Sequence, residues 1–189
     1  MYPWERVIPS QDSTLRIIHE AVKRGHEVSI TNPSNLTIRE SITLSLCKQI
    51  LLGEKLTRSI TSFYKTVKFD VKMCPLSEFD VIFMRDNPPL NGLVLNFLDS
   101  IKDDVFIINA IDGLREANNK IYTAAYFDAD RELIPATHVS KNIDYLLRII
   151  EESENDKMIM KPLDGYGGSG VIIIEKSAMK NIRSLLDFY

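Results

Sequence analysis

Apolar residues recur at helical spacing close to the start of the chain, between positions 15 and 22. Asp12, Ser13 and Thr14 stand before this run as N-cap candidates, and Gly25 follows it where a residue that ends a helix is expected. Residues 27–31 then have the composition of a short strand. The pattern therefore predicts a helix that begins after one of these candidates and ends at Gly25, with a strand directly after it.

A helix, a glycine and a strand make up half of a β–α–β unit. Its first strand is not found in residues 1–10, which contain Pro3 and Pro9 and have the composition of a loop. We therefore expect that Met1 is an internal methionine and that an apolar strand precedes it. The alternative is a sheet that begins at its second strand.

The middle of the chain alternates between strand and helix patterns. Residues 36–56 permit either a helix or a strand, whereas residues 79–84 (FDVIFM) predict a buried strand that Pro88 and Pro89 close. Residues 93–101 predict a helix, and residues 105–109 (VFIIN) predict a parallel strand that is apolar on both faces. Strand, helix and strand in succession indicate an α/β sheet.

The pattern changes near Asp112 and Gly113. Beyond this point the spacing of apolar residues predicts, in order, a helix over 114–127, a short strand over 137–140, a helix over 142–152, strands over 157–161 and 171–175, and a helix that begins at 177.

The loop between the last two strands carries the strongest chemical signal. Four of the six residues from 165 to 170 are glycine, and glycine lets backbone N–H groups approach an anion closely. A Rossmann or Walker loop runs directly into a helix, but this loop is followed by the strand-like sequence VIIIE. The flanks therefore predict a loop that covers phosphates between two strands, with Lys161 contributing a positive charge. A flexible hairpin without a ligand is the alternative.

The amino-acid composition excludes some classes of protein but does not indicate which reaction this one catalyses. Of the 189 residues, 44% are hydrophobic and 26% are charged, and the net charge is −3, which gives no reason to expect a nucleic-acid or membrane partner. No segment approaches the run of about 18 apolar residues that a membrane helix needs. Cys47 and Cys74 are far apart and lack zinc-ligand spacing, so we expect reduced thiols, no metal site and a cytoplasmic protein.

Several segments, in order, are similar to prokaryotic glutathione synthetases of the ATP-grasp superfamily. Residues 161–170 (KPLDGYGGSG) resemble the family's glycine-rich loop, and residues 81–89 (VIFMRDNPP) resemble a strand and loop of its N-terminal domain. Residues 108–120 resemble its link into the ATP-grasp domain, and residues 12–28 its first helix and second strand. At Asn87 the family usually has an acidic residue, which leaves the fine substrate contacts open.

The resemblance implies an α/β fold with two parts. A Rossmann-like pre-ATP-grasp domain on the substrate side is expected over residues 1–113, and an incomplete ATP-grasp domain, its first lobe, over residues 114–189. It also implies an ATP-dependent carboxylate–amine ligase that forms an acyl phosphate, makes an amide bond and releases ADP. Its partners would be small molecules, namely ATP and a peptide or amino acid. An incomplete lobe would expose apolar sheet surface, which favours homo-oligomers.

The resemblance also implies a set of binding residues. The expected ATP contacts are Lys120, Lys161, Gly165, Tyr166, Gly167, Gly168, Ser169 and Gly170. Arg85 is a candidate substrate contact, with a structural ion pair as the alternative. The Mg²⁺ ligands are expected outside these residues, no catalytic residue is identified, and we expect no turnover from this chain alone. A non-catalytic nucleotide-binding or interaction module is the competing hypothesis.

Overall fold

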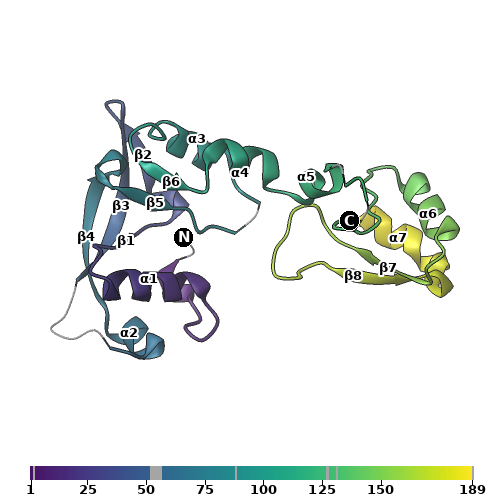
Figure 1. Ribbon diagram of the computed structural model, residues 1–189, viewed down its shortest axis with the longest axis horizontal. Coiled ribbons are helices and arrows are strands. Elements are labelled where there is room, and N and C mark those ends of the chain that lie inside the picture. Colours follow the sequence, from purple (N-terminus) through teal and green to yellow (C-terminus); the bar gives the residue numbers. More distant parts are fainter. Residues whose placement is uncertain (2, 52–56, 88, 127, 131, 189) are drawn as a thin grey trace. The chain divides into compact units, whose positions relative to one another are not determined.

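A computed structural model of the chain describes all residues except 2, 52–56, 88, 127, 131 and 189 (Figure 1). The chain divides into two compact units, Met1–Arg115 and Glu116–Tyr189. Each unit has its own apolar core, and each is described separately below.

The first unit begins with the predicted helix. Helix α1 covers Ser13–Lys23, and the Asp12 side chain caps it by accepting a hydrogen bond of 2.6 Å from the Leu15 N–H. Gly25 follows in the left-handed region at φ +86°, a conformation that glycine adopts without steric cost. Strand β1, Ser29–Ile30, comes next. The sequence prediction of a capped helix followed by a short strand is therefore confirmed.

An antiparallel sheet forms around strand β3, Ile42–Leu51. Strand β4, Lys68–Pro75, lies along one edge of β3, while β1 and β2, Leu36–Arg39, follow each other along the opposite edge. The segment that permitted either a helix or a strand is thus a β2–β3 hairpin. Glu40 and Ser41 form its turn with positive φ angles of 52° and 65°, which suits the right-handed twist of the strands.

A second, parallel pair of strands completes the sheet structure of the first unit. Strands β5, Val81–Phe83, and β6, Phe106–Ile108, pair in parallel and are connected through helix α3, Gly92–Asp99. This confirms the predicted strand–helix–strand unit and the α/β class. Strand β5 is less buried than its composition predicts, because Val81 and Phe83 are 49% and 46% exposed.

Two apolar clusters hold the first unit together. One gathers around α3 and contains Cys47, Cys74, Leu76, Leu95, Leu98, Ile101, Val105, Ile107 and Ile111. The other lies between α1 and helix α2, Ile60–Thr66, and contains Trp4, Val7, Leu15, Ile18, Val22, Ile30, Ile50 and Phe63. Single 3₁₀ turns occur in both units, at Trp4–Arg6, Pro33–Asn35, Leu76–Glu78 and Lys176–Ala178.

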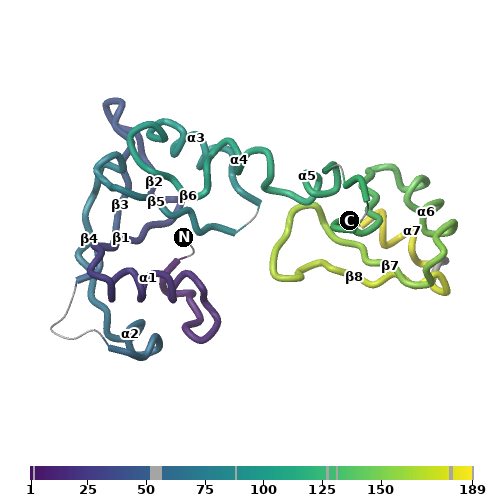
Figure 2. The backbone as a smooth tube through the Cα atoms, in the orientation of Figure 1, coloured from purple at the N-terminus to yellow at the C-terminus, as the bar shows by residue number. Residues whose placement is uncertain are grey.

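The second unit is built on an antiparallel hairpin of β7, Lys157–Met160, and β8, Ile172–Glu175. Helices α6, Ile143–Glu152, and α7, Met179–Phe188, pack on this hairpin through an apolar cluster that includes Ile150, Ile174, Ile182 and Leu186. Figure 2 shows the chain passing from β7 through a long loop into β8. Helices α6 and α7 and both strands match the sequence predictions.

Two predictions for residues 114–140 are wrong in detail. The single predicted helix is two, α4 over Ile111–Ala117 and α5 over Lys120–Ala125, because the Asn119 side chain caps the second one by accepting from the Ile121 N–H. Residues 137–140 form no strand. The Thr137 hydroxyl there donates to the Pro135 carbonyl, and the Ser140 hydroxyl accepts from the Asn142 N–H.

Candidate functional site

The glycine-rich loop joins β7 to β8 in the second unit. The last paired residues of the hairpin are Met160 and Ile172, so the loop covers residues 161–171. A strand precedes it and a strand follows it, as the sequence predicts. A Rossmann or Walker loop, by contrast, is followed directly by a helix.

The backbone of the loop depends on its glycines. Gly167, Gly168 and Gly170 have φ angles of 62°, 80° and 73°, all in the left-handed region that disfavours a Cβ. The Ser169 N–H donates to the Tyr166 carbonyl at 3.1 Å, and the Val171 N–H donates to the Gly168 carbonyl at 3.2 Å. Successive left-handed glycines with local turns are the kind of backbone that presents N–H groups to an anion.

Lys120 lies against the start of this loop although it is about forty positions away in sequence. Its ammonium donates to the carbonyls of Leu163 at 3.3 Å and Gly165 at 3.2 Å, and its own N–H donates to Leu163 at 3.3 Å. An ammonium has three donors, so these contacts leave one for a further acceptor. The contacts with Leu163 could not be predicted from the sequence, because every residue type has the same backbone carbonyl.

The other residues predicted to bind ATP differ in how close they lie to Lys120. A Cβ on Gly165 would lie 3.4 Å from Pro162 Cγ and 4.0 Å from Lys120 Nζ, so the loop passes close to the lysine there. Tyr166, Ser169 and Lys161 are exposed. The structure therefore joins Lys120 to the loop and leaves Lys161 at its rim.

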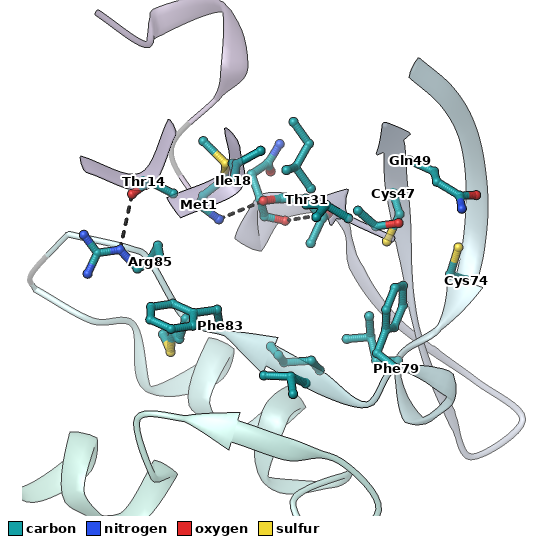
Figure 3. A pocket seen from close by; sticks show the side chains of 18 of the residues that line it. Met1, Thr14, Ile18, Thr31, Cys47, Gln49, Cys74, Phe79, Phe83 and Arg85 are labelled. Carbon is teal, nitrogen blue, oxygen red and sulfur yellow. Dashed lines mark hydrogen bonds between the residues drawn. The ribbon is translucent and has the colours of Figure 1, made fainter. Parts of the chain in front are cut away.

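A separate groove of about 710 Å³ lies in the first unit, and the predicted substrate contact Arg85 lines it (Figure 3). The Arg85 guanidinium donates to the hydroxyls of Thr14 at 3.3 Å and Ser13 at 3.0 Å, and lies 5.9 Å from the centre of the Phe83 ring. The contacts of Arg85 thus tie β5 to the start of α1. They are hydrogen bonds to hydroxyl groups, where the sequence analysis allowed for an ion pair.

The terminal ammonium of Met1 also lies at this groove, where it donates to the Thr31 carbonyl at 2.7 Å. Burial lowers its pKa from the ordinary value of 8.0, and the Asp86 carboxylate partly opposes this effect. The folded state therefore binds this proton less well than the unfolded state does. Below the lowered pKa the buried charge costs stability, and as pH rises toward 8.0 that cost disappears.

We expect the free energy of unfolding to increase between the lowered pKa of Met1 and pH 8.0. Acetylation of the α-amino group removes the charge in both states, so the acetylated chain should lose this part of the pH dependence. Urea unfolding of both forms across this range measures the difference. Identical pH profiles for the two forms would contradict the burial of the ammonium.

Thiol and metal chemistry find little support in the described residues. Burial, with a further contribution from neighbouring Cys74, raises the pKa of the Cys47 thiol to about 12, so it is protonated at neutral pH. Within the part of the chain that the structure describes, no three His, Cys, Asp or Glu side chains are grouped so that they could hold a metal ion. Among the same residues, no helix combines the length and apolar character that a membrane span requires.

The chain is similar to known proteins along most of its length. Residues 1–115 match the family model for the prokaryotic glutathione synthetase N-terminal domain, and residues 119–189 match the one for the prokaryotic glutathione synthetase ATP-grasp domain. The expected ATP-binding residues, Lys120 and the glycine-rich loop, all fall within the second match.

Individual relatives agree with these matches. The glutathione synthetase of Buchnera aphidicola from Acyrthosiphon pisum is 31% identical over 92% of this chain and 52% of its own. Those of Gloeobacter violaceus and Synechocystis are 28% and 27% identical over 98% of this chain, and over 56% and 58% of their own lengths. The chain thus spans a little over half the length of these relatives. It belongs to the prokaryotic glutathione synthetase family.

Proposed function

We propose that this chain is the nucleotide-binding part of an ATP-dependent carboxylate–amine ligase whose product is glutathione. One observation carries the proposal: a glycine-rich loop between two strands, anchored at its start by the ammonium of Lys120. Such a loop offers backbone N–H groups and one positive charge to a polyphosphate. The names of the relatives support glutathione as the product.

In this proposal the loop residues and two lysines together bind ATP. The backbone of residues 165–170 binds the phosphates, and Lys120 donates its remaining hydrogen to a phosphate oxygen. Lys161, exposed at the end of β7, adds a second positive charge. ATP, with Mg²⁺, supplies the phosphoryl group that activates the carboxylate, and the residues of this chain orient its phosphates.

Arg85 is proposed as a contact for the peptide substrate in the first unit. Its guanidinium has five donors, of which one at Nε and one at a terminal nitrogen are used by Thr14 and Ser13. The remaining donors are available for a carboxylate, which a guanidinium binds through paired hydrogen bonds.

We further propose that residues 1–113 form the substrate-side domain and that residues 114–189 form the first lobe of the ATP-grasp domain. The division into compact units after Arg115 supports a boundary close to this point.

Isothermal titration of the chain with Mg²⁺ and ATP tests the proposal directly. We expect saturable binding with one site, and we expect weaker binding of AMP, because the proposed contacts are made to the phosphates. A chain that binds neither nucleotide, while circular dichroism shows it folded, would contradict the proposed function.

The glycines of the loop provide a specific prediction. Gly167→Ala combined with Gly168→Ala should weaken ATP binding by about 30-fold or more, because a residue with a Cβ loses about 1–2 kcal/mol at each left-handed position. Titration measures the change in affinity. Gly92→Ala is the matched control, since a Cβ at Gly92 meets nothing within 4 Å, and it should leave ATP binding unchanged. Equal affinities for the double variant and the control would show that the loop does not hold the nucleotide.

The second candidate is a non-catalytic nucleotide-binding or interaction module. It would need only the loop and its contacts with Lys120, without a group that activates a carboxylate. Titration with ATP bears on the choice: weak binding without release of ADP supports the nucleotide-binding part of a ligase, and no binding at all supports a purely structural role. We expect these 189 residues to bind ATP without turnover when assayed alone.

A further inference from the structure

Arg85 follows directly after strand β5, and the backbone around it has a fixed place. The strand ends at Phe83, and the Met84 N–H still donates to the Ile108 carbonyl at the end of β6, at 2.7 Å. The Arg85 guanidinium lies over the Phe83 ring, 5.9 Å from its centre. A cation in this position is attracted by the negative face of the ring. The backbone of Arg85 and one face of its guanidinium are therefore both held by neighbouring residues.

Two hydroxyl groups hold one edge of the same guanidinium. Its Nε donates to the Thr14 hydroxyl at 3.3 Å, and its terminal nitrogen Nη2 donates to the Ser13 hydroxyl at 3.0 Å; Figure 3 shows the first of these bonds. A guanidinium can bind a carboxylate with paired hydrogen bonds through the edge of Nε and Nη2 or through the edge of its two terminal nitrogens. Because Ser13 and Thr14 occupy the first edge, the second edge is the one left for a ligand.

The start of helix α1 gives these two hydroxyls a defined position. Ser13 and Thr14 are its first two residues, and Asp12 caps the helix through its 2.6 Å bond with the Leu15 N–H. The cap therefore does not depend on either hydroxyl. Threonine is branched at Cβ, which restricts the rotation of its side chain and fixes the direction of its hydroxyl. The first turn of α1 thus presents two hydroxyls to Arg85 without losing its own cap.

We propose that Ser13 and Thr14 are positioning residues for Arg85, which orient its edge of two terminal nitrogens toward the carboxylate of a peptide. This inference rests on the proposed function, in which Arg85 contacts the peptide substrate. A free arginine side chain loses much rotamer freedom when it binds a ligand, and one that is already held loses less. If the two bonds only tied β5 to α1, their removal would change stability and leave binding as it is.

NMR titration of the ¹⁵N-labelled chain with glutathione tests the proposal. Ser13→Ala combined with Thr14→Val should weaken binding by about 3- to 10-fold, the effect of ordering one long side chain on binding. Thr14→Ser keeps both hydroxyls and should bind as the unchanged chain does. Thr61→Val combined with Ser62→Ala is the matched control, because these exposed neighbours lie in the first turn of α2 in the same unit, and it should leave binding unchanged. Glutathione diethyl ester, which has no free carboxylate, should bind to none of these chains.

The NMR signals of the guanidinium show whether Arg85 is positioned as proposed. Its Nε–H should exchange with water about tenfold faster or more in Thr14→Val, because that variant keeps the size of the side chain and removes the acceptor. Glutathione should shift the signals of the terminal nitrogens more than the signal of Nε, since Thr14 retains the Nε–H. A larger shift at Nε would overturn the proposal, because the ligand would then have replaced Thr14. Equal Nε–H exchange in Thr14→Val and the unchanged chain would overturn it as well.

Arg85→Lys separates failure of this inference from failure of the proposed function. If Arg85→Lys loses glutathione binding while the double variant of Ser13 and Thr14 binds as the unchanged chain does, Arg85 remains the substrate contact and its positioning by the hydroxyls is overturned. If Arg85→Lys binds glutathione as the unchanged chain does, or if glutathione shifts no signal of Arg85, both the contact and the positioning are overturned. Binding of ATP by the second unit is measured separately and does not depend on either result.

Discussion

Replacing Lys120 with methionine is expected to weaken ATP binding by about 10- to 100-fold, the effect of losing a charged hydrogen bond worth roughly 1.5–3 kcal/mol. The ammonium holds the carbonyls of Leu163 and Gly165 and has one donor left for a phosphate oxygen. Methionine keeps the apolar stem and removes all three donors. Isothermal titration with Mg²⁺ and ATP measures the loss.

Lys141→Met is the matched control for this variant, because Lys141 is an exposed lysine of the same unit that lies outside the loop. It changes the net charge equally and should retain the affinity of the unchanged chain. A second measurement identifies the cause of the loss. Without ATP, the amides of residues 165–169 should exchange faster in Lys120→Met, because the loop has lost its anchor. If both lysine variants bind ATP as the unchanged chain does, Lys120 has no part in the site.

In the proposed ATP site, the contacts of Lys120 would prepare the loop for its ligand. Lys120 is half-buried and held in place by loop carbonyls, so its ammonium is positioned before any phosphate arrives. Prior ordering of a contact reduces the entropy lost on binding. The side chains of Tyr166 and Ser169 are exposed, and no hydrogen bond to another described residue holds them, so the tip of the loop could adjust to a nucleotide. We infer that Lys120 fixes the base of the loop and that its glycines shape the tip.

Sequence predicted the parts of this protein whose signals are local. The Asp12 cap and Gly25 define α1 from within a few residues, and the apolar runs beside the glycine-rich loop define β7 and β8. The two apolar runs alone therefore predicted that this loop joins one strand to the next. The expectation that Lys120 contacts ATP came from the family resemblance, because no local pattern connects it to a loop about forty residues away.

Other parts were not predicted, because contacts that the apolar pattern does not reveal decide their structure. In residues 42–50 the apolar positions fit both a helix and a strand, and pairing with β4, about twenty-five residues later, selects the strand. At residues 137–140 the composition suits a strand, yet side-chain bonds with the local backbone hold an irregular segment. The strand expected before α1 stays a prediction.

Leu95→Ala is expected to destabilise the first unit by about 2–5 kcal/mol, the usual cost of removing a buried leucine and leaving a cavity. Leu95 is 2% exposed and belongs to the apolar cluster around α3, together with Cys47 of β3 and Ile107 of β6. The cluster therefore connects the antiparallel sheet to the parallel pair of strands.

Leu93→Ala in the same helix is the control for this prediction, since Leu93 is 62% exposed and its loss should change stability by no more than about 0.5 kcal/mol. Urea unfolding followed by tryptophan fluorescence reports on the first unit selectively, because Trp4 is the only tryptophan of the chain and is buried in the other cluster of that unit. A lower midpoint in Leu95→Ala with an unchanged slope would show that both clusters unfold together. Equal shifts for the two leucine variants would contradict the assignment of Leu95 to the core. A shift absent from the fluorescence of Trp4 would mean that the two clusters unfold separately.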